Sequence, residues 1–426
     1  MQALQARLFE AEKNPIEANI KKQKHLLKRL IQHAVDTTVF YQAYNKDAVI
    51  TDLPVLSRAM LQAFYDQIVS NQIPAAHGDT YAMQTSGSTG EVVRILGTGF
   101  TRLFYDALML REHRWHARDL KQKLLAIRWL NLDIAQPPNV QYQTTWGPPI
   151  DTYQQTGPSV LMNIASPTAL QVEALVQHNP YYLTTYPSQL AALARYCLAH
   201  EIKLPNLHEV RTVGEMLTEK QINLVKHAWP SVKITDIYSC IEIGSIAHQC
   251  PEYHQYHVNL EHVYLEIVDK HNQPCAIGEP GRVLVTSLMN YATPLIRYEL
   301  GDYAAWGEPC ACGRTLPVLQ HILGRKRNRL ILPNGESRFP YMGEHEDVYQ
   351  IAPIRIQKFQ FVQHTVDKIE IKVVTPDRAT STQSEAIVAF YQKIFGAHFK
   401  IRINYQDEIK AGPTGKFEEF ISYVEQ

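Results

Sequence analysis

The sequence lacks an excess of charge of either sign. Lys and Arg together number 42, and so do Asp and Glu, in a chain of 426 residues. A protein that follows a nucleic-acid backbone normally carries a surplus of basic residues, so this balance argues against a nucleic-acid partner. Local charges can still bind a small anionic substrate.

Long apolar runs are also missing. No stretch approaches the roughly 20 uninterrupted apolar residues that a membrane helix requires, so we expect no membrane partner. Residues 1–30 carry Lys, Arg and Glu throughout and have no apolar core. This segment therefore predicts a surface helix rather than a signal peptide, and we expect a cytoplasmic protein.

Cysteine is scarce, because six cysteines in 426 residues are too few for a disulfide scaffold. In a reducing compartment, clustered cysteines indicate metal binding or chemistry instead. Cys310 and Cys312 form a close pair, and Cys250, His254 and His257 lie upstream. Three thiolates and one imidazole make a closed tetrahedral zinc site. The alternative is a group of free thiols that pack near one another.

The composition that is present, 45% hydrophobic and 20% charged residues, is typical of a globular enzyme. The chain is too long for one core of ordinary size. Helical and buried-strand patterns alternate to about residue 240, and strand patterns then dominate. We predict an α/β fold with a large N-terminal domain at 1–324, including a β-rich subdomain at about 245–324. A small α+β domain should follow at 325–426.

Local patterns predict individual elements. Strands are expected at Glu209–Val213, Val232–Tyr238, Val263–Val268 and Arg282–Ser287. Helices are expected at residues 58–69, capped by Ser57, and at 188–199, capped by Ser188. Residues 131–157, rich in Asn, Gln, Pro and Gly, predict a loop.

One hydroxyl-rich segment has the composition of a phosphate-binding loop. It reads Thr85-Ser86-Gly87-Ser88-Thr89-Gly90. The glycines allow a tight turn, and the hydroxyls and backbone N–H groups can donate to phosphate oxygens. No Lys-Ser/Thr pair follows, so the common phosphate-loop motif is absent. An ordinary loop is the alternative.

Three further segments carry aromatic, acidic or basic groups near strand ends or in loops. Tyr238 and Glu242 follow a strand, where a ring can stack on a purine and a carboxylate can hold Mg²⁺ against phosphates. Asp302 is placed to accept hydrogen bonds from ribose hydroxyls, and Arg297 could pair with a phosphate or with Glu299. The Gly/Pro-rich loop at 412–417 presents Lys416. Taken singly, each segment is also compatible with a plain turn or a solvated side chain.

In their order and spacing these segments resemble the adenylate-forming superfamily of acyl-CoA synthetases, adenylation domains and luciferases. The likeness is greatest to the phenylacetate–CoA ligase branch, which includes coenzyme F390 synthetase-like proteins. It runs from His33-Ala34 to Lys416 and is most specific at 294–302 and 310–325. The resemblance implies a large domain that binds ATP and the acyl group, and a small mobile domain that carries a catalytic lysine.

The resemblance also implies roles for individual residues. The implied nucleotide site consists of Thr85, Ser86, Gly87, Ser88, Thr89, Gly90, Gly214, Glu215, Asp236, Tyr238, Ile241, Asp302 and Arg325. Gly214 and Glu215 would flank the adenine on which Tyr238 stacks, and Asp302 and Arg325 would contact the ribose. Glu242 would bind Mg²⁺ and act in catalysis together with Lys416.

Two more sites follow from the resemblance. The acyl pocket is expected in the middle of the large domain, lined by Trp146, Tyr186, Pro187 and Gly214. Its aromatic residues favour an aryl or arylacetic acid, although they are equally ordinary core residues. The implied zinc ligands are Cys250, His257, Cys310 and Cys312, with His254 in reserve.

The implied activity is adenylation of a small carboxylic acid by ATP with Mg²⁺, release of pyrophosphate, and transfer of the acyl group to coenzyme A. One alternative is an adenylating enzyme that loads the phosphopantetheine of a carrier protein or another acceptor. Another is a catalytically weak nucleotide-binding homologue. The sequence leaves the oligomeric state open, with a homodimer as one option.

Three positions depart from the pattern of the branch. Glu91-Val92 stands where Lys-Pro is usual, which removes a positive charge near the phosphates. Ile241 replaces a threonine hydroxyl before Glu242. Lys326-Arg327 replaces two acidic residues at the hinge, and a basic hinge bears on how the thiol half-reaction proceeds.

Overall fold

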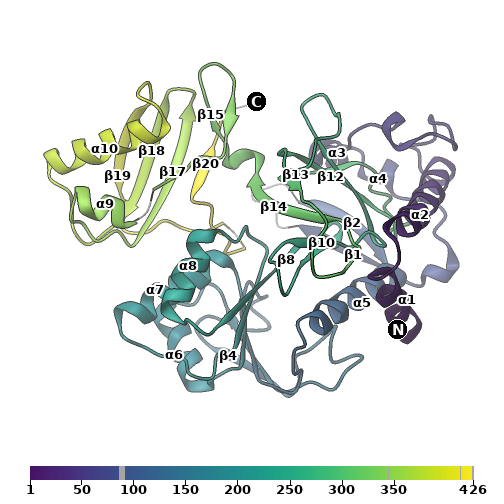
Figure 1. Ribbon diagram of the computed structural model, residues 1–426, viewed down its shortest axis with the longest axis horizontal. Helices are drawn as coiled ribbons and strands as arrows, with labels where there is room; N and C mark the ends of the chain where they lie inside the picture. Colours follow the sequence, from purple (N-terminus) through teal and green to yellow (C-terminus); the bar gives the residue numbers. More distant parts are fainter. Residues whose placement is uncertain (86–91, 344, 413, 425–426) are drawn as a thin grey trace. The chain divides into compact units, whose positions relative to one another are not determined.

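The computed structural model describes residues 1–85, 92–343, 345–412 and 414–424. It divides into two compact units, Met1–Ile322 and Leu323–Gln426. Both mix helices and strands (Figure 1), so the predicted α/β fold class is confirmed.

The large unit is built on one sheet of twelve described strands. Strands β5, β3, β6, β7 and β8 run parallel, an arrangement that needs crossover connections. Strand β9 pairs with β8 in the antiparallel sense, so the strands of the predicted β-rich subdomain continue this sheet. In order across the sheet the strands are β11 (Val263–Val268), β12 (Gly281–Ser287), β13 (Tyr298–Trp306), β14 (Val318–Arg325), β10 (Tyr256–Val258), β9 (Gly244–Gln249), β8 (Lys233–Cys240), β7 (Glu209–Val213), β6 (Tyr182–Thr185), β3 (Leu124–Arg128), β5 (Ser159–Asn163) and β4 (Val140–Gln143).

Helices supply the apolar faces that bury this sheet. Leu190 of α7 and Val225 of α8 pack in one cluster with Leu183 and Val210 of the parallel strands. Full burial of such a side chain contributes about 1.5–3 kcal/mol. The described helices of the unit are α1 (Gln2–Ala11), α2 (Ile16–Thr37), α3 (Arg58–Ala63), α4 (Tyr65–Ile68), α5 (Gly99–Trp115), α6 (Thr168–His178), α7 (Pro187–Ala199) and α8 (Glu219–Ala228). The short strands β1 (Thr80–Thr85) and β2 (Val93–Thr98) form a separate hairpin.

Three local expectations need correction. The helix expected at 58–69 is interrupted at Phe64, although Ser57 does cap its first part by accepting from the Met60 N–H at 3.1 Å. Pro187 rather than Ser188 begins α7, because proline lacks the N–H that a first helical turn leaves unpaired. The expected loop at 131–157 contains β4, which pairs with the edge of β5.

The small unit has a four-stranded sheet in the order β19-β18-β17-β20. Its core is aromatic: the Phe361 ring lies 4.9 Å from the Tyr391 ring and 5.5 Å from the Phe395 ring. Tyr391 and Phe395 come from one face of α10. The elements after β14 are η3 (Lys326–Asn328), β15 (Leu330–Ile331), β16 (Ser337–Arg338), α9 (His345–Ile351), β17 (Lys358–Thr365), β18 (Lys368–Val374), α10 (Ser381–Phe395), β19 (Lys400–Tyr405) and β20 (Phe420–Ser422).

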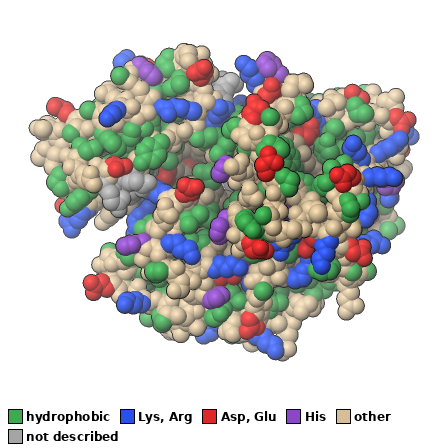
Figure 2. Space-filling view, in the orientation of Figure 1, with side chains coloured by type: hydrophobic (Ala, Val, Ile, Leu, Met, Phe, Trp, Pro, Cys, Tyr) green, Lys and Arg blue, Asp and Glu red, His purple; other side chains and the backbone are tan. Residues whose placement is uncertain are grey.

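Basic and acidic side chains alternate over the face of the molecule seen in Figure 2. This mixture accords with the equal numbers of basic and acidic residues in the sequence. Among the described helices, none has the length and apolar character needed to cross a membrane.

Candidate active site and metal centre

A buried carboxylate connects three segments of the large unit that are distant in sequence. Glu242 follows β8 and keeps 8% of its surface exposed. Its Oε1 accepts hydrogen bonds from Arg58 Nη1 at 3.2 Å and from the Tyr298 hydroxyl at 3.3 Å. Arg58 Nη2 also donates to Thr85 Oγ1 at 2.9 Å. The guanidinium therefore connects the start of the hydroxyl-rich segment to the predicted Mg²⁺ ligand.

Tyr238 and Asp302 form a second connection. The Tyr238 hydroxyl, at the end of β8, donates to Asp302 Oδ2 on β13 at 2.9 Å. The predicted adenine-stacking ring and the predicted ribose-binding carboxylate are therefore neighbours. Because β8 and β13 lie several strands apart in the sheet, this contact brings two separately predicted residues into one site.

Two other predicted nucleotide residues have structural partners. Glu215 accepts the Ser188 N–H at 2.9 Å, so its carboxylate caps the N-terminus of α7. Asp236 is buried and accepts from Thr212 at 2.6 Å and from the Tyr256 hydroxyl at 2.7 Å. Burial raises the pKa of Asp236 to about 6.

The remaining predicted residues of the large unit are less constrained by contacts. Gly214 follows β7 with φ +79°, a conformation that favours glycine. Ile241 lies in the turn between β8 and β9 and is 50% exposed. The predicted phosphate-binding residues Ser86, Gly87, Ser88, Thr89 and Gly90, and the departure at Glu91, lie outside the described residues.

Arg297 does not pair with Glu299, one of its two expected partners. It is buried, and its guanidinium pairs with Glu266 at 3.1 Å and donates to the Leu53 carbonyl at 3.1 Å. Glu299 pairs with Arg282 instead, at 2.9 Å. The expected pairing of Arg297 with Glu299 is therefore wrong, because Glu266 of β11 pairs with Arg297 and Arg282 of β12 pairs with Glu299. The alternative pairing of Arg297 with a phosphate stays a prediction.

Lys416 lies in a tight turn of the small unit. The Gly412 N–H donates to the Lys416 carbonyl at 2.8 Å, and Gly415 has φ +76°. Just beyond it, Lys358 Nζ lies 4.1 Å from the centre of the Phe417 ring, which anchors the segment on β17. The fold thus presents the lysine from a turn that is fixed at both ends.

Residues 326–328, at the predicted hinge, contact the segment that follows Lys416 within the small unit. Arg327 pairs with Glu418 at 2.7 Å, and Asn328 Nδ2 donates to the Phe420 carbonyl at 2.6 Å. The predicted ribose contact Arg325 precedes η3, and its N–H donates to Asn328 Oδ1 at 3.1 Å. Arg327, one of the two basic residues that depart from the family pattern, therefore forms an ion pair with the segment that follows Lys416.

Three of the four residues predicted to line the acyl pocket, Trp146, Tyr186 and Pro187, are buried in the core. The Trp146 indole N–H donates to the Gln122 carbonyl at 2.8 Å, and its ring packs against His113 and Tyr182. The Tyr186 hydroxyl accepts from the Trp129 N–H at 3.2 Å. Pro187 begins the helix that follows and is also buried. The acyl-pocket assignment stays a prediction.

A buried charge network lies beside these aromatic residues, and sequence reasoning missed it. Arg118 donates to Glu112 at 2.5 and 2.6 Å and to Glu209 at 2.6 Å. Arg211 on β7 donates to Glu112 at 3.4 Å and lies 3.2 Å from His113 Nε2. Burial lowers the pKa of His113 well below its usual value, so its imidazole is neutral. The network joins residues 112–118 to residues 209–211, which are 91 to 99 positions apart in the contacting pairs, so spacing gives no signal of their contact.

The four predicted zinc ligands converge. The ligand atoms of Cys250, His257, Cys310 and Cys312 all lie within 4.8 Å of one another. Cys250 Sγ and Cys310 Sγ are 3.8 Å apart, and Cys312 Sγ is 3.3 Å from His257 Nε2. With metal–sulfur bonds of about 2.3 Å, a tetrahedron has edges of about 3.8 Å. The donor set and spacing therefore fit a tetrahedral zinc ion.

The surroundings of these ligands suit a structural metal. Cys250 directly follows β9, His257 lies on β10, and the cysteine pair lies between β13 and β14. Cys250 and Cys310 are buried. Burial lowers the pKa of His257 to about 4, so the imidazole is neutral and has a lone pair for a metal. All four positions are protein ligands, which leaves no open position for catalysis.

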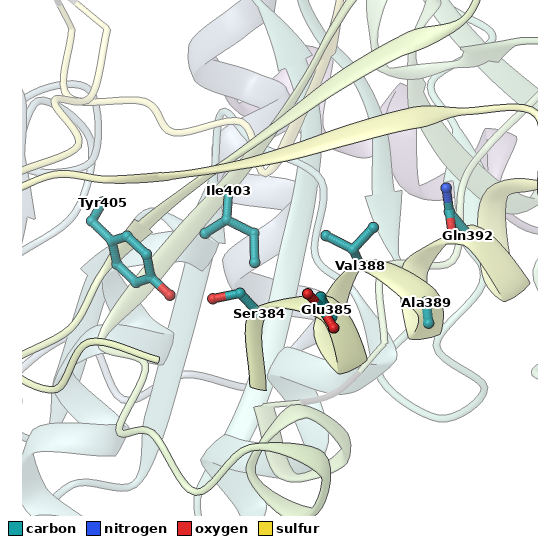
Figure 3. A pocket seen from close by; sticks show the side chains of 7 residues that line it. All are labelled: Ser384, Glu385, Val388, Ala389, Gln392, Ile403 and Tyr405. Carbon is teal, nitrogen blue, oxygen red and sulfur yellow. The ribbon is translucent and has the colours of Figure 1, made fainter. Parts of the chain in front are cut away.

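A hollow in the small unit contains none of the predicted site residues. It has a volume of about 340 Å³ and lies between α10 and β19. Figure 3 shows the helix side chains opposite Ile403 and Tyr405 of the strand. We assign it no function.

The chain is similar to known proteins in both sequence and structure. Residues 342–422 match the family described as CapK C-terminal domain. The chain is 29% identical over 215 residues to phenylacetate–coenzyme A ligase of Thermus thermophilus, an alignment that spans 48% of each protein. In structure it is similar to 2-hydroxyisobutyryl-CoA ligase in complex with 2-HIB-AMP, with TM-score 0.73, 17% identity, and coverage of 97% of this chain and 91% of that chain.

The chain has the fold of the adenylate-forming enzymes. A second similar structure is the anthranilate CoA ligase AuaEII in complex with anthranoyl-AMP, with TM-score 0.53, 16% identity, and coverage of 80% of this chain and 66% of that chain. The resemblance to adenylate-forming enzymes, with phenylacetate–CoA ligase among the relatives, is confirmed. At these identities the solved structures establish the fold alone. The sequence alignment spans only about half the length of the curated relative, so activity and substrates are matters for proposal.

Proposed function

We propose that this protein uses ATP to convert a small carboxylic acid to an acyl-adenylate and then transfers the acyl group to the thiol of coenzyme A. The observation that carries the proposal is the convergence of Thr85, Arg58 and Glu242, next to the Tyr238–Asp302 pair. The Thermus thermophilus relative is a phenylacetate–coenzyme A ligase, and the similar 2-hydroxyisobutyryl-CoA ligase structure contains 2-HIB-AMP.

In the first step the acid's carboxylate attacks the α-phosphorus of ATP and pyrophosphate leaves. Two anions approach each other, so catalysis must supply positive charge where negative charge builds up. Glu242 would hold Mg²⁺ against the phosphates, and the Lys416 ammonium would neutralise the transition state. Asp302 would accept hydrogen bonds from the ribose while Tyr238 stacks on the adenine.

In the second step the thiol attacks the acyl carbonyl carbon, and AMP leaves. Lys416 is no longer needed at the phosphate, and the thiol needs access to the adenylate. We therefore infer that the small unit moves between the two steps, as conformational gating in many enzymes requires. Arg325 and Arg327 lie where its chain begins.

The zinc ion belongs to this proposal as a structural element. Cys250, His257, Cys310 and Cys312 would hold one ion that links the β9–β10 hairpin to the loop before β14. Such a closed site contributes folding free energy rather than chemistry. It would keep β10 and β14 in register, and these two strands lie between β13, which carries Asp302, and β9, which pairs with the Tyr238 strand β8.

The test of the proposal is carboxylate-dependent ATP–pyrophosphate exchange. Benzoic, phenylacetic, cinnamic and short aliphatic acids would be compared for the wild type and Lys416→Ala. Lys410→Ala is the matched control, because Lys410 is an exposed lysine of the same segment. We expect exchange with one acid class, a loss of about 100-fold or more in Lys416→Ala, and little change in Lys410→Ala.

A folded, zinc-loaded protein that exchanges with no acid, or equal activity of Lys416→Ala and wild type, contradicts the proposal. The acceptor is tested separately. Acyl-CoA formation at saturating coenzyme A supports the second step. If acyl-adenylate accumulates and coenzyme A does not discharge it, the thiol acceptor is not coenzyme A.

A further inference from the structure

Arg297 has an unusual backbone conformation for a buried arginine. Its φ is +51°, in the left-handed region that residues with a side chain seldom occupy. Such a conformation persists only where the surrounding contacts hold it, and residues of this kind cluster at functional sites. The contacts of Arg297 therefore indicate what its conformation is used for.

The side chain and the main chain of Arg297 both hold one segment of the large unit, residues 53–58. Arg297 Nη1 donates to the Leu53 carbonyl at 3.1 Å, and the Leu56 N–H donates to the Arg297 carbonyl at 3.0 Å. The Leu56 carbonyl in turn accepts the Glu299 N–H at 3.0 Å. The segment is therefore attached to the start of β13, and Arg297 supplies two of these three hydrogen bonds.

Glu266 of β11 fixes the orientation of the Arg297 guanidinium. Arg297 Nε donates to Glu266 Oε2 at 3.2 Å, and Nη2 lies 3.1 Å from Oε1. A buried arginine–carboxylate pair with two contacts fixes geometry as well as charge. Because Nε and Nη2 face the carboxylate, Nη1 is aimed at the Leu53 carbonyl.

The segment that Arg297 holds leads directly into Arg58. Ser57 caps α3, and Arg58 is the first residue of that helix. The Arg58 side chain is 35% exposed, so packing alone does not determine where its guanidinium lies. The direction in which this side chain leaves the backbone, and hence its 3.2 Å contact with Glu242, depends on how residues 53–57 are attached to β13.

We propose that Arg297 is a positioning residue that acts through residues 53–57 to place the Arg58 guanidinium against Glu242. This inference rests on the proposed function, in which Arg58 and Glu242 belong to the nucleotide site. Arg297 touches neither ATP nor the acid in this account. Direct contact of Arg297 with a phosphate is the alternative, and the two differ in what happens when Arg58 is absent.

The first test is a double-mutant cycle on ATP–pyrophosphate exchange. Arg297→Gly adopts the φ of +51° without strain and retains the carbonyl that accepts from Leu56, so the loss is confined to the side-chain contacts. Arg282→Met is the matched control, because Arg282 lies on the neighbouring strand β12 and also pairs with a carboxylate. Its described hydrogen bonds go to groups outside residues 53–58.

We expect kcat of Arg297→Gly to fall by about tenfold, with KM for the acid changed by about twofold or less, while Arg282→Met stays near wild type. In the Arg58→Met background, Arg297→Gly should cause a further loss of about twofold or less, because the effects of residues that act through one another do not add. Equal losses with and without Arg58 overturn the inference, since a direct phosphate contact or a general loss of fold would behave in that way. A comparable loss in Arg282→Met, or full activity of Arg297→Gly or of Arg58→Met, also overturns it.

Crystal structures of the variants separate this inference from the proposed function. We expect the contact of 3.2 Å between Arg58 Nη1 and Glu242 Oε1 to be kept in Arg282→Met and lost in Arg297→Gly. If no acid supports exchange but this displacement is seen, the proposed function fails and the inference stands. If Arg58 keeps its place in Arg297→Gly, the inference is overturned whatever the exchange rates are.

Glu266→Gln is the second variant, for the case in which melting curves show that Arg297→Gly does not fold. An amide has one oxygen, so this variant keeps Arg297 but removes one of the two acceptors that orient it. Exchange should fall in the same direction, again with little further loss in the Arg58→Met background. Unchanged exchange together with an unchanged position of Arg58 in Glu266→Gln overturns the inference.

Discussion

The Arg58 guanidinium lies 3.2 Å from the Glu242 carboxylate, although 184 positions separate the two residues in sequence. The same guanidinium reaches Thr85, so one side chain links the end of β1 to the end of β8. In the proposed reaction the Arg58–Glu242 ion pair would break when ATP binds, and Glu242 would then bind Mg²⁺. Arg58 would then be free to contact a phosphate.

Replacement of this arginine should impair adenylation. Arg58→Met removes positive charge and the tie between Thr85 and Glu242, so kcat/KM for ATP–pyrophosphate exchange should fall by about 100-fold, as for loss of one transition-state donor. Arg94→Met, a change at an exposed arginine of β2, is the control. Exchange by Arg58→Met at the rate of the control would mean that Arg58 only positions the hairpin.

Removal of one zinc ligand should remove the metal and destabilise the large unit. We expect one zinc per chain by elemental analysis of the wild type and none in Cys310→Ser. The free energy of unfolding should fall by about 4 kcal/mol or more, because loss of a metal is among the few single changes with so large an effect. Cys275→Ser, at a buried thiol outside the cluster, should keep its zinc. Full zinc content in Cys310→Ser would contradict the site.

The buried Asp236 should make stability depend on pH. Its pKa of about 6 in the folded protein lies above the ordinary 3.8, so the folded state binds the proton more tightly. The favourable contribution is therefore complete below pH 4 and is lost as pH rises through 6, a change of about 3 kcal/mol. Asp236→Asn should flatten this dependence, since an amide can donate to Thr212 and accept from Tyr256.

The measurement is urea unfolding between pH 4.5 and 7.5, followed by tryptophan fluorescence. All five tryptophans lie at or before residue 306, so the signal reports the large unit. An unchanged pH slope in Asp236→Asn would show that another group is responsible. Unchanged ATP affinity in this variant would also remove Asp236 from the predicted nucleotide site.

The hinge pair should affect the thiol step more than adenylation. Arg327 pairs with Glu418, two residues after Lys416, so Arg327→Met loosens the lysine segment from the hinge. We expect the rate of acyl transfer to coenzyme A to change by about tenfold while exchange changes by about threefold or less, because gating controls the second step. Arg355→Met, which breaks an exposed pair with Asp377, is the control. Equal effects on both steps would argue against a hinge role.

Much of the fold was predictable because its signals are local. The strands at 209–213, 263–268 and 282–287 appear close to where apolar patterns predict them, since a buried strand shows itself within a few residues. For the metal cluster, the sequence showed the close Cys310–Cys312 pair, and the resemblance implied Cys250 and His257 as its partners. Cysteine and histidine have few other uses at that spacing, and the four ligand atoms do converge.

The parts of the site that depend on contacts between residues far apart in sequence were not predictable. Nothing near Arg58 in the sequence points to Glu242, and nothing near Arg211 points to Glu112 and His113. Glu215 matched a nucleotide motif, but its contact with the N-terminus of α7 shows only in three dimensions. Each of these contacts joins two strands or helices whose pairing the chain order does not fix.

The central claim is tested most directly by the products of a single turnover. The protein would be mixed with ATP labelled at the α-phosphate and with the best acid of the panel, first without coenzyme A. The account predicts acyl-AMP and pyrophosphate in equal amounts, followed by acyl-CoA and AMP when coenzyme A is added. Formation of ADP and phosphate, or of AMP that does not depend on the acid, would contradict it.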